Sequence, residues 1–298
     1  MGTQGAVVIT GASTGIGQAC ALRLDRLGFH VFAGVRKLAD GSALKRRASE
    51  RLTTVLIDVT DAASLAAAAR TVDTSIGAAG LAGLVNNAGI VVAGALEFLP
   101  LSELRRQFEV NVIGQVATIQ AFLPLLRRGH GRIVNMGSIE GLWATPFTGA
   151  YVASKFALEG LTDSLRMELR AWDMQVSIIE PGVIATPLWE KLQDATAALA
   201  EALPAQARDL YGLHFAAHHR AADKLAGAGI SAEAVAHAVS RALVAKRPRT
   251  RYVVGREARI GAILARFLPD RLRDALTTRR LGLSIPREST DPSPPHRT

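Results

Sequence analysis

Residues 6–17, AVVITGASTGIG, decide the fold of this chain. The apolar run Ala6–Thr10 is typical of a buried strand. Three glycines follow it, and apolar residues then recur at helical spacing: Gly11, Gly15, Gly17, and Ile16, Cys20, Leu24, Leu27. The stretch therefore predicts a strand, a glycine turn and a helix.

The glycine turn has the properties of a phosphate-binding loop. Glycine adopts dihedral angles that other residues avoid and lets the backbone approach a ligand closely. The N-terminus of the following helix offers free amides and a partial positive charge to a pyrophosphate. The spacing is G-x-x-x-G-x-G and not the G-x-G-x-x-G fingerprint, so a plain structural turn is the alternative.

The second predicted strand, 30–34, ends where an open α/β sheet faces the adenosine ribose. NAD specificity needs an acid there, whereas a 2′-phosphate needs arginine. Val35 occupies the acid position, and Arg36 and Lys37 follow. We therefore expect NADP(H), with Arg36 on the phosphate and NAD(H) as the second choice; a solvated basic turn is the alternative.

Two further strands, 53–57 and 81–85, also end in polar residues. Asp58 follows the first and is expected to meet the adenine ring. Residues 86–89, Asn-Asn-Ala-Gly, follow the second, and their amide side chains suit a tightly held backbone in the same crevice. Farther on, Asn111 and Gly114 interrupt a helix predicted over 101–126, either as a local break that binds water or as tolerated surface positions.

A hydroxyl, a phenol and an amine follow within one segment. Ser138 comes just after the strand 132–136, and Tyr151 and Lys155 are i and i+4 on a predicted helix. The ammonium of Lys155 should therefore lower the pKa of the Tyr151 phenol towards neutrality. A phenol tuned in this way can serve as general acid or base, and Ser138 would bond the same substrate oxygen. A chance Tyr-x-x-x-Lys on a helix is the alternative.

Six motifs occur in order over about residues 5–255: Thr10–Gly17, Asn86–Gly89, Asn111, Ser138, Tyr151-x-x-x-Lys155, and Pro181-Gly182 with Thr186. Together they resemble the motif set of the short-chain dehydrogenase/reductase family. The resemblance implies an α/β fold, a single doubly wound Rossmann domain with a seven-stranded parallel sheet. It also implies NAD(P)(H) binding and hydride transfer between nicotinamide and a carbonyl or alcohol carbon. A dinucleotide-binding sensor or scaffold without chemistry is the alternative.

By the same resemblance, Tyr151 is the acid/base, Ser138 orients the substrate oxygen, Lys155 lowers the tyrosine pKa and holds the nicotinamide ribose, and Asn111 anchors a relay water. The implied cofactor contacts are Gly11, Ser13, Thr14, Gly15, Ile16, Gly17, Arg36, Asp58, Val59, Asn87, Ala88, Gly89, Tyr151, Lys155, Pro181, Gly182, Ile184 and Thr186. Many NADP-dependent members have a basic residue where this chain has Thr14. Members often pair through the helices that carry Asn111 and Tyr151, which implies a homodimer or homotetramer.

A substrate lid is expected over about 183–230, within a catalytic domain of residues 1–255. Large side chains in it and in the 138–151 loop suggest a hydrophobic substrate, although ordinary packing explains them equally: Leu142, Trp143, Phe147, Leu188, Trp189, Leu192, Leu210, Tyr211, Leu213 and Phe215. Three histidines, His214, His218 and His219, lack an acid or cysteine at ligand spacing, so no metal site is predicted.

Residues 256–283 carry apolar residues at helical spacing opposite arginines, with Pro269 between two predicted short helices. Such a basic amphipathic extension suits three roles: covering the substrate cleft, packing on a partner subunit, or lying on an anionic membrane. Its composition resembles the retinol and hydroxysteroid dehydrogenase branch, which favours a lipophilic, steroid- or retinoid-like substrate. Residues 284–298, rich in proline, are expected to form a disordered tail.

Composition limits the remaining classes. The chain has 298 residues, 49% of them apolar, which suffices for a large core. Cys20 is the single cysteine, so an internal disulfide is excluded and a reducing compartment is expected. We find no secretory signal pattern and no apolar run of transmembrane length, so the expected location is cytoplasmic, with at most peripheral membrane contact.

Between Lys246 and Arg280 there are eleven basic residues and three acids, a surplus of eight that makes up most of the net charge of +9. Because this charge is local, no nucleic-acid partner is predicted.

Overall fold

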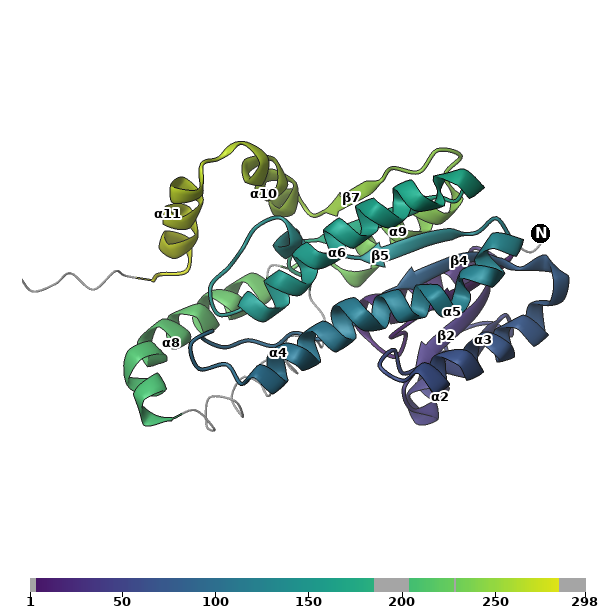
Figure 1. The fold of residues 1–298 in the computed structure, drawn as a ribbon, viewed down its shortest axis with the longest axis horizontal. Helices are drawn as coiled ribbons and strands as arrows, with labels where there is room; N and C mark the ends of the chain where they lie inside the picture. Colours follow the sequence, from purple (N-terminus) through teal and green to yellow (C-terminus); the bar gives the residue numbers. More distant parts are fainter. Residues whose placement is uncertain (1–3, 185–203, 228, 284–298) are drawn as a thin grey trace, which may run out of the picture.

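The chain forms a seven-stranded parallel sheet in a computed structural model, which describes residues 4–184, 204–227 and 229–283 (Figure 1). The strand order is β3-β2-β1-β4-β5-β6-β7, and every neighbouring pair is parallel. The strands are β1 (Ala6–Ile9), β2 (His30–Val35), β3 (Leu52–Leu56), β4 (Leu81–Asn86), β5 (Arg132–Met136), β6 (Val176–Pro181) and β7 (Arg251–Val254). The order reverses after β3, which is the doubly wound topology.

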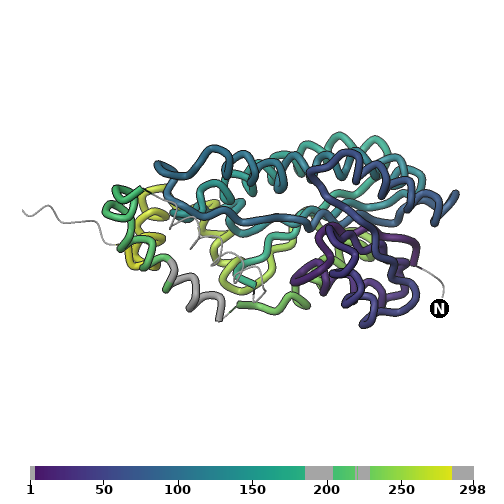
Figure 2. The backbone as a smooth tube through the Cα atoms, turned by 90° about the horizontal axis from the view of Figure 1, so that it is seen from below, coloured from purple at the N-terminus to yellow at the C-terminus, as the bar shows by residue number. Residues whose placement is uncertain are grey.

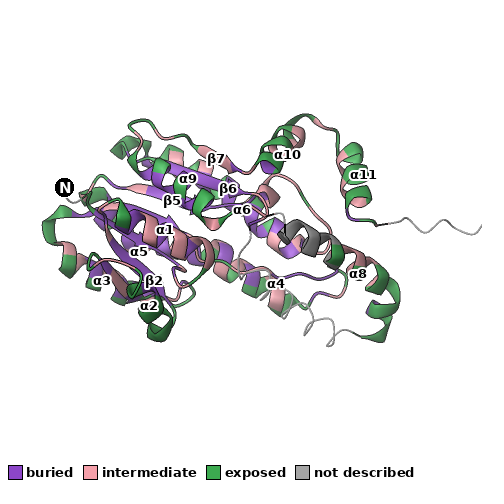
Figure 3. Cartoon of the chain, turned by 180° about the vertical axis from the view of Figure 1, so that it is seen from behind, coloured by how far each residue is buried: buried purple, intermediate pink, exposed green. Residues whose placement is uncertain are grey.

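Helices cover both faces of the sheet. They are α1 (Gly15–Arg26), α2 (Leu38–Lys45), α3 (Ala62–Ile76), α4 (Leu101–Phe108), α5 (Gly114–Arg128), α6 (Gly149–Glu168), α8 (Ala205–Gly227), α9 (Ala232–Val244), α10 (Arg256–Phe267) and α11 (Asp270–Arg280). Short helical turns are η1 (Gly77–Ala79), η2 (Glu109–Ile113), η3 (Ile139–Gly141) and η4 (Leu169–Trp172). Helices α3, α5 and α6 lie on one face, whereas α1 and α9 lie on the other (Figures 1 and 3).

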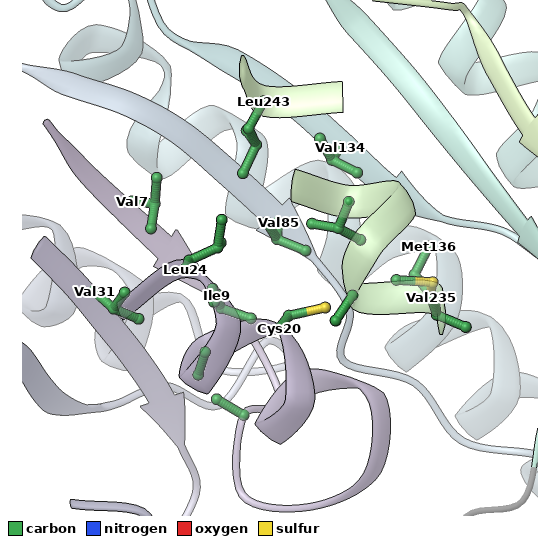
Figure 4. Close-up of a cluster of buried hydrophobic side chains, with 14 of the residues drawn as sticks. Val7, Ile9, Cys20, Leu24, Val31, Val85, Val134, Met136, Val235 and Leu243 are labelled. Carbon is green, nitrogen blue, oxygen red and sulfur yellow. The ribbon is translucent and has the colours of Figure 1, made fainter. Parts of the chain in front are cut away.

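Alternation along β1 divides the core between the two faces. Val7 and Ile9 point to a cluster with Cys20 and Leu24 of α1 (Figure 4), whereas Val8 joins residues of α3 and α5 on the opposite face. Because both faces are covered, β1 is apolar throughout its length, as parallel strands generally are. The five strands expected from apolar runs are confirmed to within two residues at either end.

The C-terminal extension forms two helices, α10 and α11, on either side of Leu268 and Pro269. The predicted break at the proline is confirmed, because proline removes an amide donor and clashes with the preceding turn. Helices α8 and α11 lie at the end of the molecule farthest from the N-terminus (Figures 1 and 2). The predicted tail, 284–298, lies outside the described residues.

One segment corrects the expectation that no apolar run reaches transmembrane length. Residues Leu101–Arg128 form a continuous helical segment of 28 residues whose most apolar 18-residue window has a mean hydropathy of 1.3, so by length and composition alone the segment could span a membrane. The segment packs in this fold against the sheet, and 44% of its most apolar window is buried. Its apolar side chains Ile119, Phe122 and Leu126 form part of the core beneath β4, which accounts for its composition.

Candidate active site

The glycine turn between β1 and α1 has the backbone geometry that its sequence requires. Gly11 and Gly15 have φ angles of +65° and +58°, which L side chains rarely adopt. A Cβ on Gly17 would overlap the carbonyl oxygen of Gly11 and lie 2.5 Å from Nδ2 of Asn87. All three glycines are therefore needed for this turn.

The N-terminus of α1 is free to receive an anion. Thr14 precedes the helix in an extended conformation and makes no side-chain capping bond, and the first turn carries no acid. The first amides of the helix therefore keep their donors and the helix dipole is not offset. Ser13, Thr14 and Ile16 flank these amides, so this end of α1 fits the pyrophosphate of a dinucleotide.

Asn87 and Thr10 join the ends of β1 and β4. The Thr10 hydroxyl accepts hydrogen bonds from the amides of Asn87 and Ala88, both at 3.0 Å. The Asn87 side-chain amide donates to the carbonyl oxygens of Thr10 and Gly11, at 3.0 and 3.1 Å. The prediction of a tight backbone held by side-chain amides is confirmed at this position, which leaves Gly89 beside the Asn111 side chain.

Arg36 and Asp58 occupy the ends of β2 and β3. Val35 is buried and Arg36 is exposed, so the position that would hold an acid for NAD carries no charge. Hydrogen bonds from the Thr60 hydroxyl and amide lower the pKa of Asp58, and the charge of Arg36 adds to this effect against the opposing effect of burial. An arginine at this strand end fits a ribose 2′-phosphate. Val59, next along the chain, is buried against Gly114.

Asn111 lies in a π-helical turn, η2, that interrupts the α4–α5 helix. Its side chain is fully buried; Oδ1 accepts from the Ile90 amide at 2.9 Å, and Nδ2 donates to the Ile90 carbonyl oxygen at 3.0 Å and to Ser154 Oγ at 3.2 Å. The local break is confirmed, and the surface interpretation is wrong. The expectation that this break binds water stays a prediction, because the Asn111 oxygen accepts one hydrogen bond and keeps a second acceptor position.

Gly114 accounts for the position of that break. A Cβ at Gly114 would lie 2.8 Å from Cγ2 of Val59 and 2.9 Å from its carbonyl oxygen. The Gly114 amide donates to Glu109, five residues earlier, which closes the π turn. Glycine thus allows the helix to approach the end of β3 at this point, and π turns occur frequently at functional sites.

Ser138, Tyr151 and Lys155 come together at the carboxyl end of β5. Ser138 follows the strand and accepts from the Glu140 amide at 3.1 Å, while its hydroxyl also interacts with the Tyr151 phenol. Lys155 is buried; its Nζ donates to the Met136 carbonyl oxygen at 2.7 Å and lies 5.5 Å from the centroid of the Tyr151 ring. The sequence prediction that these three side chains share one place in the fold is confirmed.

The predicted effect of Lys155 on Tyr151 is corrected. Burial raises the pKa of the Tyr151 phenol well above its usual value, the Glu140 carboxylate raises it further, and the contact with Ser138 lowers it only in part. Burial also lowers the pKa of Lys155 to about 8, against the opposing effect of Glu159. The amine bonds the Met136 carbonyl and not the phenol, so desolvation outweighs the Coulombic attraction expected from the spacing.

Glu140 belongs to this site and was not predicted from the sequence. Its carboxylate accepts a hydrogen bond from the Thr145 hydroxyl, which lies 2.6 Å from that of Thr148. Burial raises the pKa of Glu140, and the hydrogen bonds from Thr145 and Thr148 oppose this effect. The acid therefore ties the loop after Ser138 to the start of α6. The Ser138-x-Glu140 spacing was its only sequence signal, and such a spacing is common.

The loop after β6 lies beside the extension. Pro181 ends the strand, and the Gly182 amide donates to the Val254 carbonyl oxygen at 3.0 Å. A Cβ on Gly182 would be 3.1 Å from that of Ala258 in α10, and Ile184 forms a parallel bridge with Ile230. Thr186, Leu188, Trp189 and Leu192 lie outside the described residues.

Aromatic side chains gather where α8 meets the 138–151 loop. Phe147 lies 4.8 Å from Phe215 and 6.2 Å from Tyr211, measured between ring centroids, and 5.6 Å from the ring of His218. The Tyr211 hydroxyl donates to the Glu97 carboxylate at 2.7 Å. Phe147 adopts a φ of +65°, which is strained for a side chain of this size. The cluster therefore links α8, the segment before α4 and the Tyr151 loop.

Trp143 connects the same loop to the extension. Its indole Nε1 donates to the Thr277 hydroxyl of α11 at 2.8 Å, and a Cβ on Gly261 of α10 would contact the Ile139 side chain at 3.6 Å. The interpretation that the extension covers the substrate side of the fold therefore has contacts to support it.

Comparison with known proteins identifies the class. The short chain dehydrogenase family profile matches residues 5–197. Mouse retinol dehydrogenase 5 is 37% identical over 91% of this chain and 87% of its own length. Bovine 17-beta-hydroxysteroid dehydrogenase type 6 is 36% identical over 92% and 87%, and an NADPH-dependent 3-dehydrocapnine reductase from Ornithobacterium rhinotracheale is 35% identical over 90% and 94%.

Solved structures agree with this assignment. A short-chain dehydrogenase from Streptomyces avermitilis superposes with a TM-score of 0.74 at 27% identity, covering 95% of this chain and 98% of its own. A short chain dehydrogenase from Burkholderia cenocepacia in complex with NADP has a TM-score of 0.69 at 26% identity, over 95% and 99%.

The chain belongs to the short-chain dehydrogenase/reductase family and is an NAD(P)-dependent oxidoreductase. Within the family it is a member of the retinol and hydroxysteroid dehydrogenase branch. The fold prediction, a Rossmann domain with a seven-stranded parallel sheet, is confirmed. The roles assigned to single residues stay predictions, although the structure places the described ones along the carboxyl ends of the strands.

Proposed function

We propose that this protein is an NADP(H)-dependent oxidoreductase that interconverts a hydrophobic alcohol and its ketone or aldehyde, with a steroid-, retinoid- or lipid-like skeleton. The observation that carries the proposal is that Ser138, Tyr151 and Lys155 come together at the end of β5. The uncapped turn before α1 lies at the same edge of the sheet. A non-catalytic dinucleotide sensor would not need the phenol, the hydroxyl and the amine together.

The residues at the sheet edge fit a nicotinamide dinucleotide. The α1 amides would hold its pyrophosphate, Arg36 its 2′-phosphate, Asp58 the adenine, and Lys155 the nicotinamide ribose. When bound, such a cofactor exchanges a hydride with the carbon of the substrate. In reduction, Tyr151 donates its phenolic proton to the carbonyl oxygen; in oxidation, the phenolate takes the proton from the hydroxyl. Ser138 donates a hydrogen bond to the same oxygen and fixes its place.

The environment of Tyr151 suits the first of these steps. Burial and Glu140 keep the phenol protonated near neutral pH, so a proton is present for transfer to a carbonyl oxygen. The developing negative charge on that oxygen would lie within the field of the Lys155 ammonium. A positive charge placed where negative charge forms stabilises the transition state without reorganisation of solvent.

The preference for a hydrophobic substrate is supported by the aromatic cluster of Phe147, Tyr211 and Phe215. Tyr211 and Phe215 belong to α8, and Phe147 belongs to the loop between Ser138 and Tyr151. Apolar lining with a few convergent polar groups is typical of small-molecule sites. Relatives that are named for retinol and for hydroxysteroids support the same class.

Three experiments test the proposal. Fluorescence titration should show that NADPH binds more tightly than NADH, and a panel of aliphatic, steroid and retinoid carbonyls should show turnover that rises with apolar surface. Absence of quenching by either cofactor, together with no turnover across the panel, would refute it. Thr277→Val, which removes the hydroxyl that Trp143 contacts, should raise KM for the bulky substrates and leave KM for short ones unchanged.

We also propose that the extension contacts an anionic membrane surface. Apolar side chains of α10 and α11 are about half exposed or more: Ile260, Ile263, Phe267, Leu272 and Leu276. The local surplus of arginine around them is the composition that binds acidic headgroups. In flotation with phosphatidylcholine vesicles, the full chain should bind only when phosphatidylserine is included. Equal partitioning of wild type and Phe267→Glu would exclude this contact.

Self-association is proposed through α5 and α6, which lie side by side on one face (Figure 1). Ile113 at the end of η2 and Phe156 and Leu161 of α6 are exposed apolar side chains, 52%, 45% and 38% accessible. A second copy of the chain would cover them and form a homodimer, or a homotetramer through a further contact. Sedimentation should show that Phe156→Arg is a monomer. A variant with the wild-type mass would refute this interface.

A further inference from the structure

A group of charged side chains lies between α6 and the sheet, behind Lys155. Glu159 is one helical turn after Lys155, and Glu180 is the penultimate residue of β6, directly before Pro181. Their side chains are 9% and 0% exposed. Such a layer is normally apolar, because removing a charge from water costs several kcal/mol. The carboxyl groups of Glu159 and Glu180 take no part in the backbone hydrogen bonds of the sheet or the helix, so their burial needs another explanation.

Arg251 of β7 is the cation of this group. Its guanidinium contacts Glu159 at 2.9 Å, Asp163 at 2.8 Å and Glu180 at 3.2 Å. Asp163 also pairs with Arg166, so Arg251 is shared among three acids. One arginine therefore cannot neutralise both Glu159 and Glu180.

The unsatisfied atoms indicate where a proton lies. Oε1 of Glu159 and both carboxyl oxygens of Glu180 are buried and accept no hydrogen bond of good geometry, although Arg251 Nε lies 3.2 Å from Oε1 of Glu180. Two ionised carboxylates in this position would repel each other, whereas one protonated carboxyl can donate to the other and satisfy both. Burial and the neighbouring Glu159 raise the pKa of Glu180 to about 8, so Glu180 is the partner that keeps the proton. Burial raises the pKa of Glu159 as well, but Arg251 opposes this.

The pair is coupled to Lys155 from one side. Burial lowers the pKa of the Lys155 ammonium to about 8, and the negative charge of Glu159 opposes that loss. Glu159 also meets η3, since a Cβ on Gly141 would lie 3.2 Å from its Cγ and 3.1 Å from the Lys155 carbonyl oxygen. The groups that surround the pair are Lys155 and Asp163 of α6, with Arg166 behind Asp163, and Arg251 of β7.

We propose that Glu159 and Glu180 share one proton as a buried carboxyl pair clamped by Arg251, and that this pair keeps Lys155 charged and in place to hold the cofactor. Glu159 and Glu180 are thus positioning residues that act through Lys155. The inference rests on the proposed role of Lys155 at the nicotinamide ribose. It also explains why a carboxyl directly precedes the Pro181-Gly182 loop: the clamp joins α6, β6 and β7 beneath one site.

The first test measures the Kd of NADPH by fluorescence from pH 6 to pH 10. In the wild type, affinity should fall as Lys155 loses its charge. In Glu159→Gln, the midpoint of that fall should move down by about one pH unit, which is the order expected when a neighbouring charge is removed. Glu168→Gln, the same change at an exposed position of α6, should leave the midpoint unchanged. A midpoint in Glu159→Gln equal to the wild type would overturn the coupling.

The second test needs neither cofactor nor turnover. Infrared difference spectra of the full-length protein across pH 7 to pH 9 should show a protonated carboxylic acid band that disappears in Glu180→Gln and persists in Glu168→Gln. Absence of the band, or its survival in Glu180→Gln, would overturn the shared proton. If NADPH bound at no pH, the proposed function and the role of Lys155 would both fail, whereas the infrared band would still decide the carboxyl pair.

Discussion

Replacing Gly17 by alanine should damage the cofactor turn while leaving the rest of the fold in place. The new methyl would overlap the Gly11 carbonyl oxygen and lie 2.5 Å from Asn87 Nδ2 and 2.9 Å from the Gly11 carbonyl carbon, where 3.4 Å or more is ordinary contact. Two of these atoms are backbone, so the turn itself must move by about 1 Å. Overpacking of this kind costs about 1–3 kcal/mol.

Gly160→Ala is the matched control, because it makes the same change in a helix where a Cβ meets nothing within 4 Å. Alanine is favoured over glycine in a helix interior by roughly 0.5–1 kcal/mol, so this variant should be more stable than the wild type. For a chain of this size, 1 kcal/mol corresponds to a Tm change of about 2 °C.

Thermal unfolding and NADPH titration of both variants separate the two effects. Gly17→Ala should unfold at a lower temperature and bind NADPH at least tenfold more weakly, whereas Gly160→Ala should unfold slightly higher with unchanged affinity. The reasoning would be refuted by a Gly17→Ala protein that binds NADPH as tightly as the wild type, since the turn would then tolerate a side chain against the backbone of Gly11.

Three further outcomes are expected. Tyr151→Phe should lower kcat by about 10²–10⁴-fold with little change in NADPH affinity, because only the transferred proton is lost; full activity would exclude Tyr151 as the acid/base. Arg36→Ala should weaken NADPH by about 10–100-fold and NADH hardly at all, as expected for one charge-assisted contact, and an unchanged ratio would place the phosphate elsewhere. Glu180 has a raised pKa, so the stability that its bound proton contributes is fully present below the unfolded value of about 4.5 and is lost progressively as the pH rises to about 8. Over that window the wild type should lose stability with pH at up to about 1.4 kcal/mol per unit relative to Glu180→Gln, measured by urea unfolding; parallel curves would contradict the shared proton.

The sequence predicted the parts of this fold that depend on local pattern. Strands such as β5 and the break at Pro269 follow from apolar runs and from proline chemistry, and the structure has both. The glycines were predicted from their freedom at positive φ, and Gly11 and Gly15 do adopt it. Gly17 has two reasons: a Cβ there would overlap the Gly11 carbonyl oxygen of the same turn, and the Asn87 side chain of a distant segment also approaches it. No local pattern could show that approach.

The interior of the site could not be predicted in the same way, because it depends on which distant groups share a buried space. Asn111 was recognised as a break in a helix, but its partners are Ile90, 21 residues earlier, and Ser154, 43 residues later. Glu180 and Arg251 lie on neighbouring strands separated by the whole of α8 and α9. In the sequence, Glu180 and Arg251 each look like an ordinary surface charge.

The Tyr151–Lys155 pair shows which physical effect the spacing alone leaves out. An i, i+4 relation places an ammonium near a phenol and predicts a lowered tyrosine pKa, provided that solvent exposure is similar for both. In the folded protein both groups are buried, the amine bonds the Met136 carbonyl oxygen, and the Glu140 carboxylate raises the pKa of the phenol. Burial therefore keeps the phenol neutral and makes the Lys155 ammonium easier to deprotonate. The site then needs a neighbouring group that keeps Lys155 charged. Glu159, one turn farther along the same helix, raises the pKa of Lys155 through its negative charge, and that charge depends on Glu180 holding the shared proton.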